Sequence, residues 1–481
     1  MTEDPWQNGR RQKRGILRGG GYTLFTMALL GGMPASSQAQ TNFSDLLVNG
    51  PVSNRVNIVF LAEGYRTNEY ASFLAHATNA LNILLAGQPF AEYQSYFNAY
   101  AIAVPSAQSG SDHPVNGVTG FRDTYFNSTY GYSDYLISIP PNEFDLNYSN
   151  GQGRVAALLA TFMPECDLAV MLVNDHTVGG SDGGGGIALS SISPNSLSDF
   201  VVHETGHVLA GLGDEYTLAY PGFPDTEEPN TTRETNRASI KWNAWIAAET
   251  PVPTPATGEY ADRVGLFEGA HYHETGWYRP KLNCRMGNNG IGFCEVCSEA
   301  LVLSFYREVR PVESRLPASG NLLVTTGGAL EFSLAMVQPS SHALSIQWLT
   351  NGTPVPDATG NTFRVLPELL SNGLNTITAQ VVDPTPLVRT DPTNVLAQTV
   401  GWAVDVDLPY LQLDEPRWLD GGRFTFRVSG VAPEGFLIQA SSNFTVWTPL
   451  LTNSLVNGQF QYTNLNSGQF ASRFFRAVVL P

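Results

Sequence analysis

The chain has few basic residues: 26 lysines and arginines stand against 43 aspartates and glutamates, which gives a formal net charge of −17. After residue 40 the sequence contains no cluster of lysine and arginine. Nucleic-acid binding needs a basic stripe, and a strongly acidic surface repels phosphate. Nucleic acid is therefore excluded as a partner, and the acidic charge mainly favours solubility.

Long apolar runs are also scarce. The one near the N-terminus, at residues 22–33, has about 12 residues, whereas a helix needs roughly 20 to cross a bilayer. A basic segment precedes this run, and a small-x-small sequence follows it at residues 37–39, which is the pattern of a secretory signal peptide. We therefore expect a signal peptide at residues 1–39, no membrane span after its removal, and a mature protein that is secreted or otherwise extracytoplasmic, at the cell surface or in the periplasm. Removing five basic and two acidic residues takes the formal charge from −17 to −20.

Cysteine is scarce as well: the chain has four, and three of them lie within residues 284–297. In an exported protein such clustering favours disulfides over free thiols, so we expect at least one bridge within this segment. Four cysteines permit three pairings, and the sequence does not choose among them. A structural zinc site is the rival interpretation, but it normally needs two C-x-x-C arms and one is present, at residues 294–297. The disulfide candidates are Cys166, Cys284, Cys294 and Cys297.

Of the eight histidines, two belong to an H-E-x-x-H motif in the sequence HETGHVLAGLGDEY at residues 203–216. On a helix, His203 and His207 lie one turn apart on the same face. Their imidazoles can then bind one Zn²⁺, while Glu204 acts as general base on a water held by the metal. The motif therefore predicts a hydrolase with one catalytic zinc ion.

A catalytic zinc needs a third protein ligand and an open fourth position. Gly211 and Gly213 let the helix end and the chain turn back, which makes Asp214 the best candidate. Glu215 is the alternative, and Asp214 would then orient one of the histidines. Later candidates for the third ligand are Glu227, Glu228 and Glu234.

The residue pattern changes near residue 312. Before it, strand-like runs alternate with helical patterns, as in an α/β (α+β) domain. After it, short alternating runs are separated by Gly, Pro, Asn and Asp, which is typical of an all-β sandwich. We expect a catalytic domain at residues 40–312 that folds by itself, an Ig-like β-sandwich module at 313–407 and a small β module at 408–481. These two accessory modules are available for glycan or cell-surface contact.

The elements expected around the motif place it in the first domain. Expected strands lie at residues 56–61, 99–104, 168–173 and 187–191, and expected helices at 68–85, 198–212 and 297–309. The strand at 187–191 follows a glycine-rich loop at 179–186 and directly precedes the motif helix. We expect this strand to be a sheet edge, where a substrate peptide pairs through its backbone. The loop is either a simple hairpin connection or part of the cleft wall.

Four segments of the sequence resemble a known family. NIVFLAEGYRTNEYASF at residues 57–73 is followed by HETGHVLAGLGDEY at 203–216, VGLFEGAHYHETGWYRP at 264–280 and CRMGNNGIGFCEVC at 284–297. Over about residues 50–310 the chain resembles the M64 peptidases, the IgA-peptidase family of secreted zinc endopeptidases. The resemblance implies a zincin-like catalytic domain that cleaves peptide bonds, with its third zinc ligand in the D-E-Y sequence, which supports Asp214. Cleavage of immunoglobulin A does not follow from the motifs.

Two further residues are candidates for the site. Met286 fits a Met-turn, in which a thioether packs beneath the metal ligands. Tyr278 is the candidate oxyanion donor, because a tyrosine hydroxyl can stabilise the charge that develops on the scissile carbonyl. The alternatives for this donor are His271, His273 and Arg285.

These observations favour a secreted zinc endopeptidase that acts on extracellular polypeptides. Two alternatives remain open. The first is a zinc hydrolase of a non-peptide bond, such as a deacetylase or amidase, for which a closed pocket rather than a long groove is expected. The second is a surface binding protein whose metal site is structural.

Overall fold

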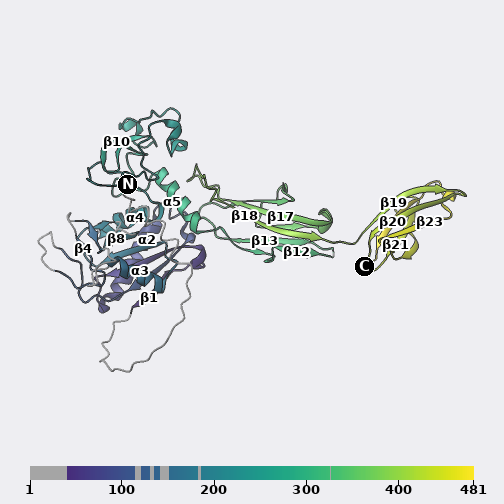
Figure 1. The fold of residues 1–481 in the computed structure, drawn as a ribbon, viewed down its shortest axis with the longest axis horizontal. Helices are drawn as coiled ribbons and strands as arrows, with labels where there is room; N and C mark the ends of the chain where they lie inside the picture. Colours follow the sequence, from purple (N-terminus) through teal and green to yellow (C-terminus); the bar gives the residue numbers. More distant parts are fainter. Residues whose placement is uncertain are drawn as a thin grey trace, which may run out of the picture. The chain divides into compact units, whose positions relative to one another are not determined.

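The computed structural model describes most of the chain after residue 40: residues 41–113, 121–130, 135–140, 151–181, 186–325 and 327–480. The predicted signal peptide at residues 1–39 and the glycines at 183–185 lie outside these described residues. The chain divides into two units. The first unit consists of the chain up to Glu313 together with residues 337–344 and 382–397. The first unit is α+β and the second is all β (Figure 1).

The first unit is built on a six-stranded sheet with the order β1-β3-β2-β6-β8-β7. The four inner strands are parallel, and the two edge strands are antiparallel to their neighbours. The strands expected in this domain are all present. β1 and β7 were not predicted, because the first is short and half polar and the second is a Gly-Ser pair without an apolar residue. The bounds are β1 (Asn42–Leu47), β2 (Val56–Glu63), β3 (Phe97–Ala103), β6 (Leu168–Val173), β7 (Gly180–Ser181) and β8 (Ile187–Ser191).

Helices cover both faces of this sheet. Along β2, Ile58 and Phe60 face the core that is shared with α2, α4 and α5, whereas Val59 and Leu61 face α3. Successive strand residues point to opposite faces, so a strand that is covered on both sides reads as a continuous apolar run. Helix α3 was not predicted, since two glycines in its first turn weaken the helical signal. The bounds are α2 (Tyr70–Ala86), α3 (Gly151–Phe162), α4 (Pro194–Ala210) and α5 (Glu295–Glu308).

Helix α4 carries the H-E-x-x-H motif, and local sequence sets both of its ends. The Ser193 hydroxyl accepts a hydrogen bond from the Ser196 amide at 3.2 Å, and Pro194 occupies the first helical position. At the other end Gly211 is left-handed, with φ 63°, as expected for a helix C-cap. The helix therefore begins four residues before the expected start and ends two residues before the expected end, at Ala210, with Gly211 as its C-cap.

The prediction that β8 is a free sheet edge is wrong. β7 pairs with it in antiparallel fashion, with Gly180 opposite Ser190 and Ser181 opposite Leu189. All five residues of β8 are buried. The chain just before β8 folds back onto it, so a substrate strand cannot pair at these two positions, and the edge belongs to β7.

Beyond residue 311 two sheets pack face to face. Rings from both sheets make the core between them: the ring centroids of Phe332 and Trp402 are 4.9 Å apart, and those of Phe363 and Trp348 are 5.2 Å apart. The predicted β-sandwich is therefore present, while its Ig-like classification stays a prediction. The sheets have the orders β11-β13-β16 and β12-β18-β17-β14-β15. The bounds are β11 (Val312–Leu316), β12 (Asn321–Val324), β13 (Leu330–Met336), β14 (Ser345–Thr350), β15 (Thr353–Pro354), β16 (Thr362–Val365), β17 (Gly373–Val382) and β18 (Ala397–Val406).

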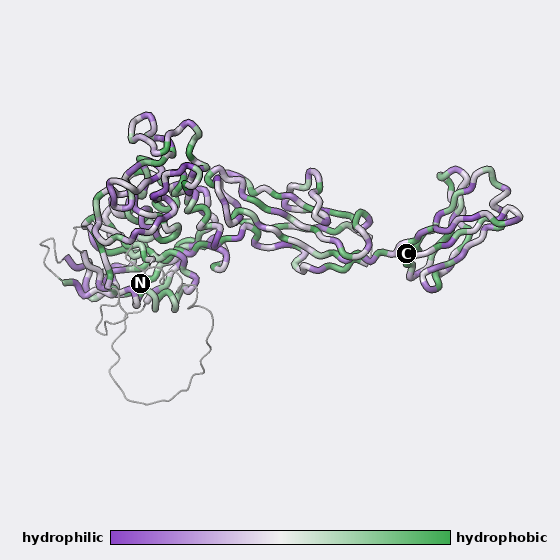
Figure 2. The backbone as a smooth tube through the Cα atoms, turned by 45° about the horizontal axis from the view of Figure 1, so that its top comes forward, coloured by the Kyte–Doolittle hydropathy of each residue, from purple (hydrophilic) through white to green (hydrophobic). Residues whose placement is uncertain are grey.

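The C-terminal residues form two more three-stranded sheets, β19-β20-β23 and β22-β21-β24. Their core contains Phe426, Val428, Phe436 and Ile438. Apolar and polar residues alternate along the strands of the second unit (Figure 2), as the sequence pattern predicts. The bounds are β19 (Tyr410–Leu419), β20 (Arg423–Val431), β21 (Phe436–Ser441), β22 (Thr448–Asn453), β23 (Gln459–Asn464) and β24 (Phe474–Val479).

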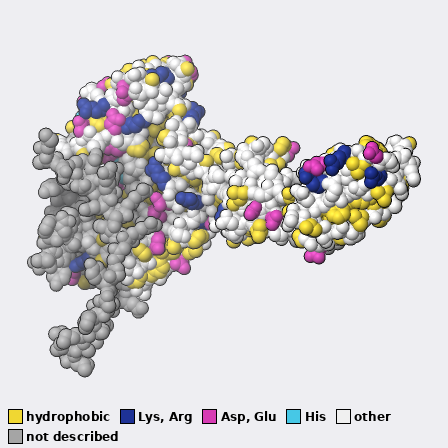
Figure 3. All heavy atoms as spheres, turned by 45° about the vertical axis from the view of Figure 1, so that its right-hand side comes forward, with side chains coloured by type: hydrophobic (Ala, Val, Ile, Leu, Met, Phe, Trp, Pro, Cys, Tyr) yellow, Lys and Arg dark blue, Asp and Glu magenta, His cyan; other side chains and the backbone are white. Residues whose placement is uncertain are grey.

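The distribution of charged side chains on the surface agrees with the absence of a lysine and arginine cluster from the sequence after residue 40. On the face drawn in Figure 3, lysine and arginine side chains are interspersed with aspartate and glutamate. Among the described residues, no helix has the length and apolar character that a bilayer-spanning helix requires.

Two segments from beyond residue 312, at 337–344 and 382–397, are part of the first unit. This differs from the expectation that residues 40–312 fold by themselves. The imidazole of His342 lies 2.8 Å from the Glu92 carboxylate through Nδ1 and 2.6 Å from the Asp383 carboxylate through Nε2. Asp383 is buried, and its second oxygen accepts hydrogen bonds from the hydroxyls of Tyr93, at 2.8 Å, and Tyr306, at 2.5 Å. The core of the first unit is therefore incomplete without residues 337–344 and 382–397.

We predict that a chain ending at residue 312 is less stable than one ending at residue 407. The shorter chain leaves the buried hydroxyls of Tyr93 and Tyr306 without their acceptor, at about 1–3 kcal/mol each. Thermal unfolding should show a Tm lower by about 4 °C or more. In the full-length chain, Asp383→Ala should reproduce part of the loss. Equal melting temperatures for the two lengths would contradict the prediction.

Candidate active site

The two motif histidines face each other on α4. Their Nε2 atoms are 3.0 Å apart. Nδ1 of His203 lies 2.9 Å from the carbonyl oxygen of Arg285, and Nδ1 of His207 lies 2.6 Å from that of Leu212. A carbonyl oxygen only accepts, so each Nδ1 carries a proton and donates it. In the neutral imidazole, the lone pair is then on Nε2, which is the atom free to bind a metal.

Asp214 completes a triangle of donor atoms. Its Oδ1 lies 3.0 Å from Nε2 of His203 and 3.4 Å from Nε2 of His207. Around a tetrahedral Zn²⁺ with bonds of about 2.0–2.2 Å, ligand atoms are separated by about 3.3–3.6 Å. Two imidazoles and one carboxylate at nearly this spacing fit a zinc ion and leave a fourth position for water or substrate. The structure thus brings together the three ligands that the sequence favours.

Gly213 lets the chain deliver Asp214 to the histidines. Its backbone N–H donates to Asn230 Oδ1 at 2.7 Å, and Asn230 Nδ2 donates to its carbonyl at 2.9 Å. A Cβ atom at this position would lie 2.5 Å from the Glu228 carboxylate. Gly213 therefore lets the Glu228 side chain pack closely against the backbone. Gly211 has a different role, because it adopts a left-handed conformation that favours glycine.

Glu204 lies beside the triangle. It is buried, and its Oε2 lies 4.0 Å from Nε2 of His207. The side chain is thus within reach of a water molecule that occupies the fourth position. This is the placement that a general base requires.

The three proposed ligands are strongly coupled electrostatically. Burial alone would lower the pKa of His207, but the Asp214 and Glu204 carboxylates and the Leu212 carbonyl together outweigh burial and raise that pKa to about 10. Burial would raise the pKa of Asp214, but the histidines hold it well below its usual range. The imidazoles therefore attract protons strongly. A cation must displace these protons, so its affinity falls as the pH falls.

Tyr272, which the sequence did not single out, holds the second oxygen of Asp214. Its hydroxyl donates to Asp214 Oδ2 at 2.5 Å, which leaves Oδ1 to face the histidines. The residue lies in the two-residue turn between β9 (Phe267–Ala270) and β10 (His273–Arg279). His271 and Tyr272 are both left-handed there, with φ 55° and 60°. Neither is the Asn or Gly that normally marks such a turn, so no local signal predicted it.

Backbone hydrogen bonds hold this unusual turn against the site. The N–H of His271 donates to the Asp214 carbonyl at 3.0 Å, and the N–H of Tyr272 donates to the Tyr216 carbonyl at 2.8 Å. A left-handed conformation costs a residue other than glycine about 1–2 kcal/mol. Contacts that offset such strain are typical of functional sites. Here they aim the Tyr272 hydroxyl at Asp214.

Tyr216 is the second tyrosine at the site. Its ring is nearly parallel to that of His203, with centroids 6.0 Å apart. Burial, together with the charges of Asp214 and Glu204, raises its pKa. For Tyr278, the predicted oxyanion donor, burial and Glu268 raise the pKa, and its backbone pairs with Thr232. Among the described residues, hydrogen bonds and ring contacts join Tyr216 and Tyr272, but not Tyr278, to the histidines and Asp214.

The other ligand candidates are engaged elsewhere. Glu215 turns away from the histidines: its Oε1 accepts from Asn230 Nδ2 at 2.9 Å and lies 3.8 Å from Cys297 Sγ. The remaining three contact neighbouring side chains or backbone instead of the histidine pair: Glu227 binds Lys241, Glu228 binds His271, and Glu234 binds the Asn236 amide.

The alternative oxyanion donors also have other partners. His271 stacks on Trp277, with centroids 3.8 Å apart, and both its ring nitrogens are hydrogen-bonded, to Glu228 and to a backbone carbonyl. His273 is exposed and contacts the His271 carbonyl. Arg285 forms an ion pair with Asp199 at 2.6 Å. These side chains hold the fold around the site.

Met286 packs beneath the histidine turn. It is fully buried, and its sulfur lies 3.0 Å from the point that a Cβ atom on Gly206 would occupy. Its carbonyl accepts a hydrogen bond from the Glu215 amide at 2.8 Å. The Met-turn assignment stays a prediction, and the glycine between the two histidines leaves room for the Met286 sulfur.

The expected disulfides are not formed in the structure. None of the four cysteines forms a disulfide, and the sulfurs of Cys284 and Cys297 are 3.5 Å apart, against about 2.05 Å in a disulfide. Cys166 packs against the core on the opposite face of the sheet, so it is not available to the others. Cys284, Cys294 and Cys297 instead gather around Glu215.

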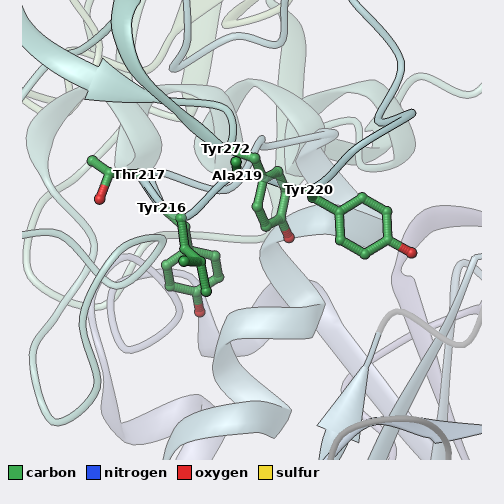
Figure 4. A pocket seen from close by; sticks show the side chains of 6 residues that line it. Tyr216, Thr217, Ala219, Tyr220 and Tyr272 are labelled. Carbon is green, nitrogen blue, oxygen red and sulfur yellow. The ribbon is translucent and has the colours of Figure 1, made fainter.

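A cavity of about 290 Å³ adjoins the site. The rings of Tyr216, Tyr220 and Tyr272 surround it, together with the chain between the first two (Figure 4). Two of these three tyrosines also contact the proposed ligands, Tyr216 through His203 and Tyr272 through Asp214. The cavity therefore lies next to the site and is lined by aromatic rings.

We predict that Tyr272→Phe weakens metal binding about 10- to 100-fold, because it removes the hydrogen bond that orients the Asp214 carboxylate. Competition with a chelator of known affinity measures the change. Tyr278→Phe is the matched control and should bind metal as the wild type does. An unchanged affinity in Tyr272→Phe would contradict the role of Tyr272 in orienting Asp214.

Comparison with known proteins identifies the family. No curated protein matches the chain. Among solved structures, the chain is similar to the apo structure of Bacteroides uniformis beta-glucuronidase 3, at 12% identity and a TM-score of 0.14, over 42% of this chain and 27% of that one. It is also similar to a chimeric titin Z1Z2-Z1Z2 tandem, at 10% identity and a TM-score of 0.12, over 35% of this chain and 94% of that one. These TM-scores are too low to support any conclusion about fold or function.

The family model of IgA Peptidase M64, in contrast, matches residues 45–260 and 256–305, more than half of the chain. The matched residues include β2, the H-E-x-x-H helix, Asp214 and the turn that carries Met286. The resemblance inferred from the four sequence segments is therefore confirmed, and the chain belongs to the IgA Peptidase M64 family.

Proposed function

We propose that this M64 peptidase is a secreted, zinc-dependent endopeptidase. The observation that carries the proposal is the triangle of His203 Nε2, His207 Nε2 and Asp214 Oδ1, with Glu204 beside it. Both imidazoles are fixed in the tautomer that binds a metal, because backbone carbonyls accept from their Nδ1 atoms. Zinc, when bound there, polarises the scissile carbonyl and lowers the pKa of a water molecule.

The protein's own groups then move the protons. Glu204 accepts a proton from the attacking water as the new C–O bond forms at the scissile carbonyl carbon. The same carboxyl group gives that proton to the amide nitrogen as the C–N bond breaks. The products are a carboxylic acid and an amine, the acid passes its remaining proton to the amine to give a carboxylate and an ammonium group, and Glu204 returns to its ionised form. Tyr216, whose ring lies against His203, is better placed than Tyr278 to donate to the developing oxyanion.

The cavity beside the site favours a polypeptide substrate over a small molecule. Its volume of about 290 Å³ accommodates one large side chain, and its apolar wall comes from Leu218 and the tyrosine rings. Leu218 and Tyr220, which line the cavity, are 82% and 59% exposed, so the cavity is open to solvent and does not enclose a whole small molecule. A deacetylase or amidase would need an enclosing pocket at the metal. We infer that the cavity binds an aromatic or large aliphatic side chain next to the scissile bond.

Export is part of the proposal and rests on residues 1–39. A basic segment, a short apolar run and a small-x-small site are the features that support it. The acidic charge of the mature chain suits an extracytoplasmic enzyme that acts on other proteins. We propose that the β modules at residues 313–407, Ig-like in fold, and 408–481 are accessory and contact a cell surface or glycan.

We predict that Glu204→Gln retains zinc and fold but loses about 10²- to 10⁴-fold in kcat, because the amide cannot accept the proton. Turnover of an unfolded protein substrate, with zinc content measured in the same sample, tests this. Glu249→Gln, at an exposed ion pair with Arg263, is the matched control and should be fully active. Wild-type turnover in Glu204→Gln would refute the role of Glu204.

We also predict that Tyr220→Ala changes specificity. The variant should lose about 10-fold or more in kcat/KM for a peptide with phenylalanine beside the scissile bond, and much less for the same peptide with alanine. The loss should lie mainly in KM. Tyr410→Ala, at an exposed position in the C-terminal module, is the control. An equal loss for both peptides would argue against a side-chain pocket.

A further inference from the structure

A second cluster of potential metal ligands lies next to the histidine site. It comprises the sulfurs of Cys284, Cys294 and Cys297 and a carboxylate oxygen of Glu215, all within 4.8 Å of one another. The four side chains are buried, with at most 4% of any residue exposed. Cys284 Sγ lies 3.5 Å from Cys297 Sγ, and Cys297 Sγ lies 3.8 Å from Glu215 Oε1. Around a tetrahedral zinc, two sulfurs at about 2.3 Å from the metal are about 3.8 Å apart.

A disulfide accounts for this cluster less well than a metal does. A bridge uses two of the three cysteines and leaves the third thiol buried against a carboxylate. A buried carboxyl group needs partners, and outside the cluster the Glu215 carboxyl group has the neutral donor Asn230 Nδ2, whereas the Arg279 guanidinium donates to the Glu215 backbone carbonyl. A divalent cation would use all three sulfurs and neutralise part of the charge of Glu215.

The backbone around the cysteines also suits a metal. Cys284 begins a tight turn in which the amides of Gly287 and Asn288 donate to its carbonyl at 3.0 and 2.9 Å. Cys294 is the N-cap of α5, and Cys297 lies in the first turn of that helix. The amide of Cys294 points at Cys284 Sγ, 3.3 Å away. Backbone N–H groups that point at sulfur stabilise the thiolate form that binds metals.

Glu215 takes the place of the fourth cysteine. The sequence has one C-x-x-C arm, at residues 294–297, and its other arm reads Cys284-x-x-Gly287. A Cβ atom on Gly287 would lie 3.1 Å from the Cβ of Glu215. The glutamate side chain therefore occupies the space that a cysteine at 287 would fill. This explains why spacing alone disfavoured a zinc site in the sequence.

We propose that Cys284, Cys294, Cys297 and Glu215 bind a second, structural zinc ion. Thiolates select zinc over harder divalent cations, and four protein ligands fill a tetrahedral shell without leaving a position for substrate. Zinc binding releases the protons of the three thiols. The bound ion leaves a net charge of −2, and the half-buried Arg279 lies beside it, with Nη1 donating to the Glu215 carbonyl at 3.1 Å.

The second ion would position the ligands of the first. Glu215 directly follows Asp214, and its amide donates to the Met286 carbonyl at 2.8 Å. The turn that begins at Cys284 also supplies the Arg285 carbonyl that fixes the tautomer of His203. A metal that locks this turn to Glu215 therefore holds Met286 and His203 in place. Its role is to position the site and not to react with substrate.

Metal analysis and X-ray absorption of the full-length protein test the proposal. The wild type purified with zinc should contain about two zinc ions per chain, with sulfur and nitrogen or oxygen neighbours in one averaged spectrum. His203→Ala should retain one zinc ion whose neighbours are mostly sulfur. Cys294→Ser should lose the sulfur signal and show a lower melting temperature. Cys166→Ser, at the cysteine outside the cluster, is the matched control and should match the wild type.

The outcomes separate this site from the proposed active site. Sulfur coordination that survives in His203→Ala supports the second ion even where the enzyme has no peptidase activity. If Cys294→Ser does not fold, the spectra of the wild type and His203→Ala still decide the question. A wild type with no sulfur neighbours around zinc would overturn the proposal. So would mass mapping that finds a disulfide between any two of the three cysteines in the zinc-loaded protein.

Discussion

The placement of the Asp214 carboxylate, whose side chain is only 12% exposed, is the constraint on which the rest of the site depends. A buried charge is costly unless it is paired and hydrogen-bonded, and both oxygens of Asp214 have partners. One oxygen faces the two imidazoles, and the other accepts from Tyr272. Tyr272 reaches Asp214 from a strained left-handed turn at residues 271–272. The backbone carbonyls of Asp214 and Tyr216 accept hydrogen bonds from this turn and hold it in place.

The turn at residues 284–287 connects this charge to the protein core. Arg285 contributes its carbonyl to His203, while Met286 packs its thioether against the helix at Gly206. The helix approaches the turn so closely only because Gly206 has no side chain. Small changes in the turn would therefore move His203 relative to Asp214. Helix α5 begins a short way along the chain, at Glu295, so the turn lies between the ligand site and a helix that belongs to the core of the first unit.

Local patterns predicted the parts of the molecule that depend on neighbouring residues in the sequence. The four-residue spacing of His203 and His207, the stop at Gly211 and the apolar strands of the sheet belong to this class. Tyr272, β7 and the role of Asp383 depend on partners far away in the chain and carry no local signal. Glu215 was considered only as an alternative to Asp214, because a sequence does not show toward which side of the chain a side chain points.

The directions in which the side chains of Asp214, Glu215 and Tyr216 point decide which cluster each of them contacts. Asp214 and Tyr216 contact His203, whereas Glu215 between them contacts the cysteine cluster. Where side chains alternate in this way, residues two apart share a side. The hydrogen bonds from Glu215 to Met286 and from Tyr272 to Tyr216 fix the register of the segment. A shift of one residue would leave a carboxylate at only one of the two sites, and one of the wrong length, so the two proposed metal-binding groups constrain the same three residues from opposite sides.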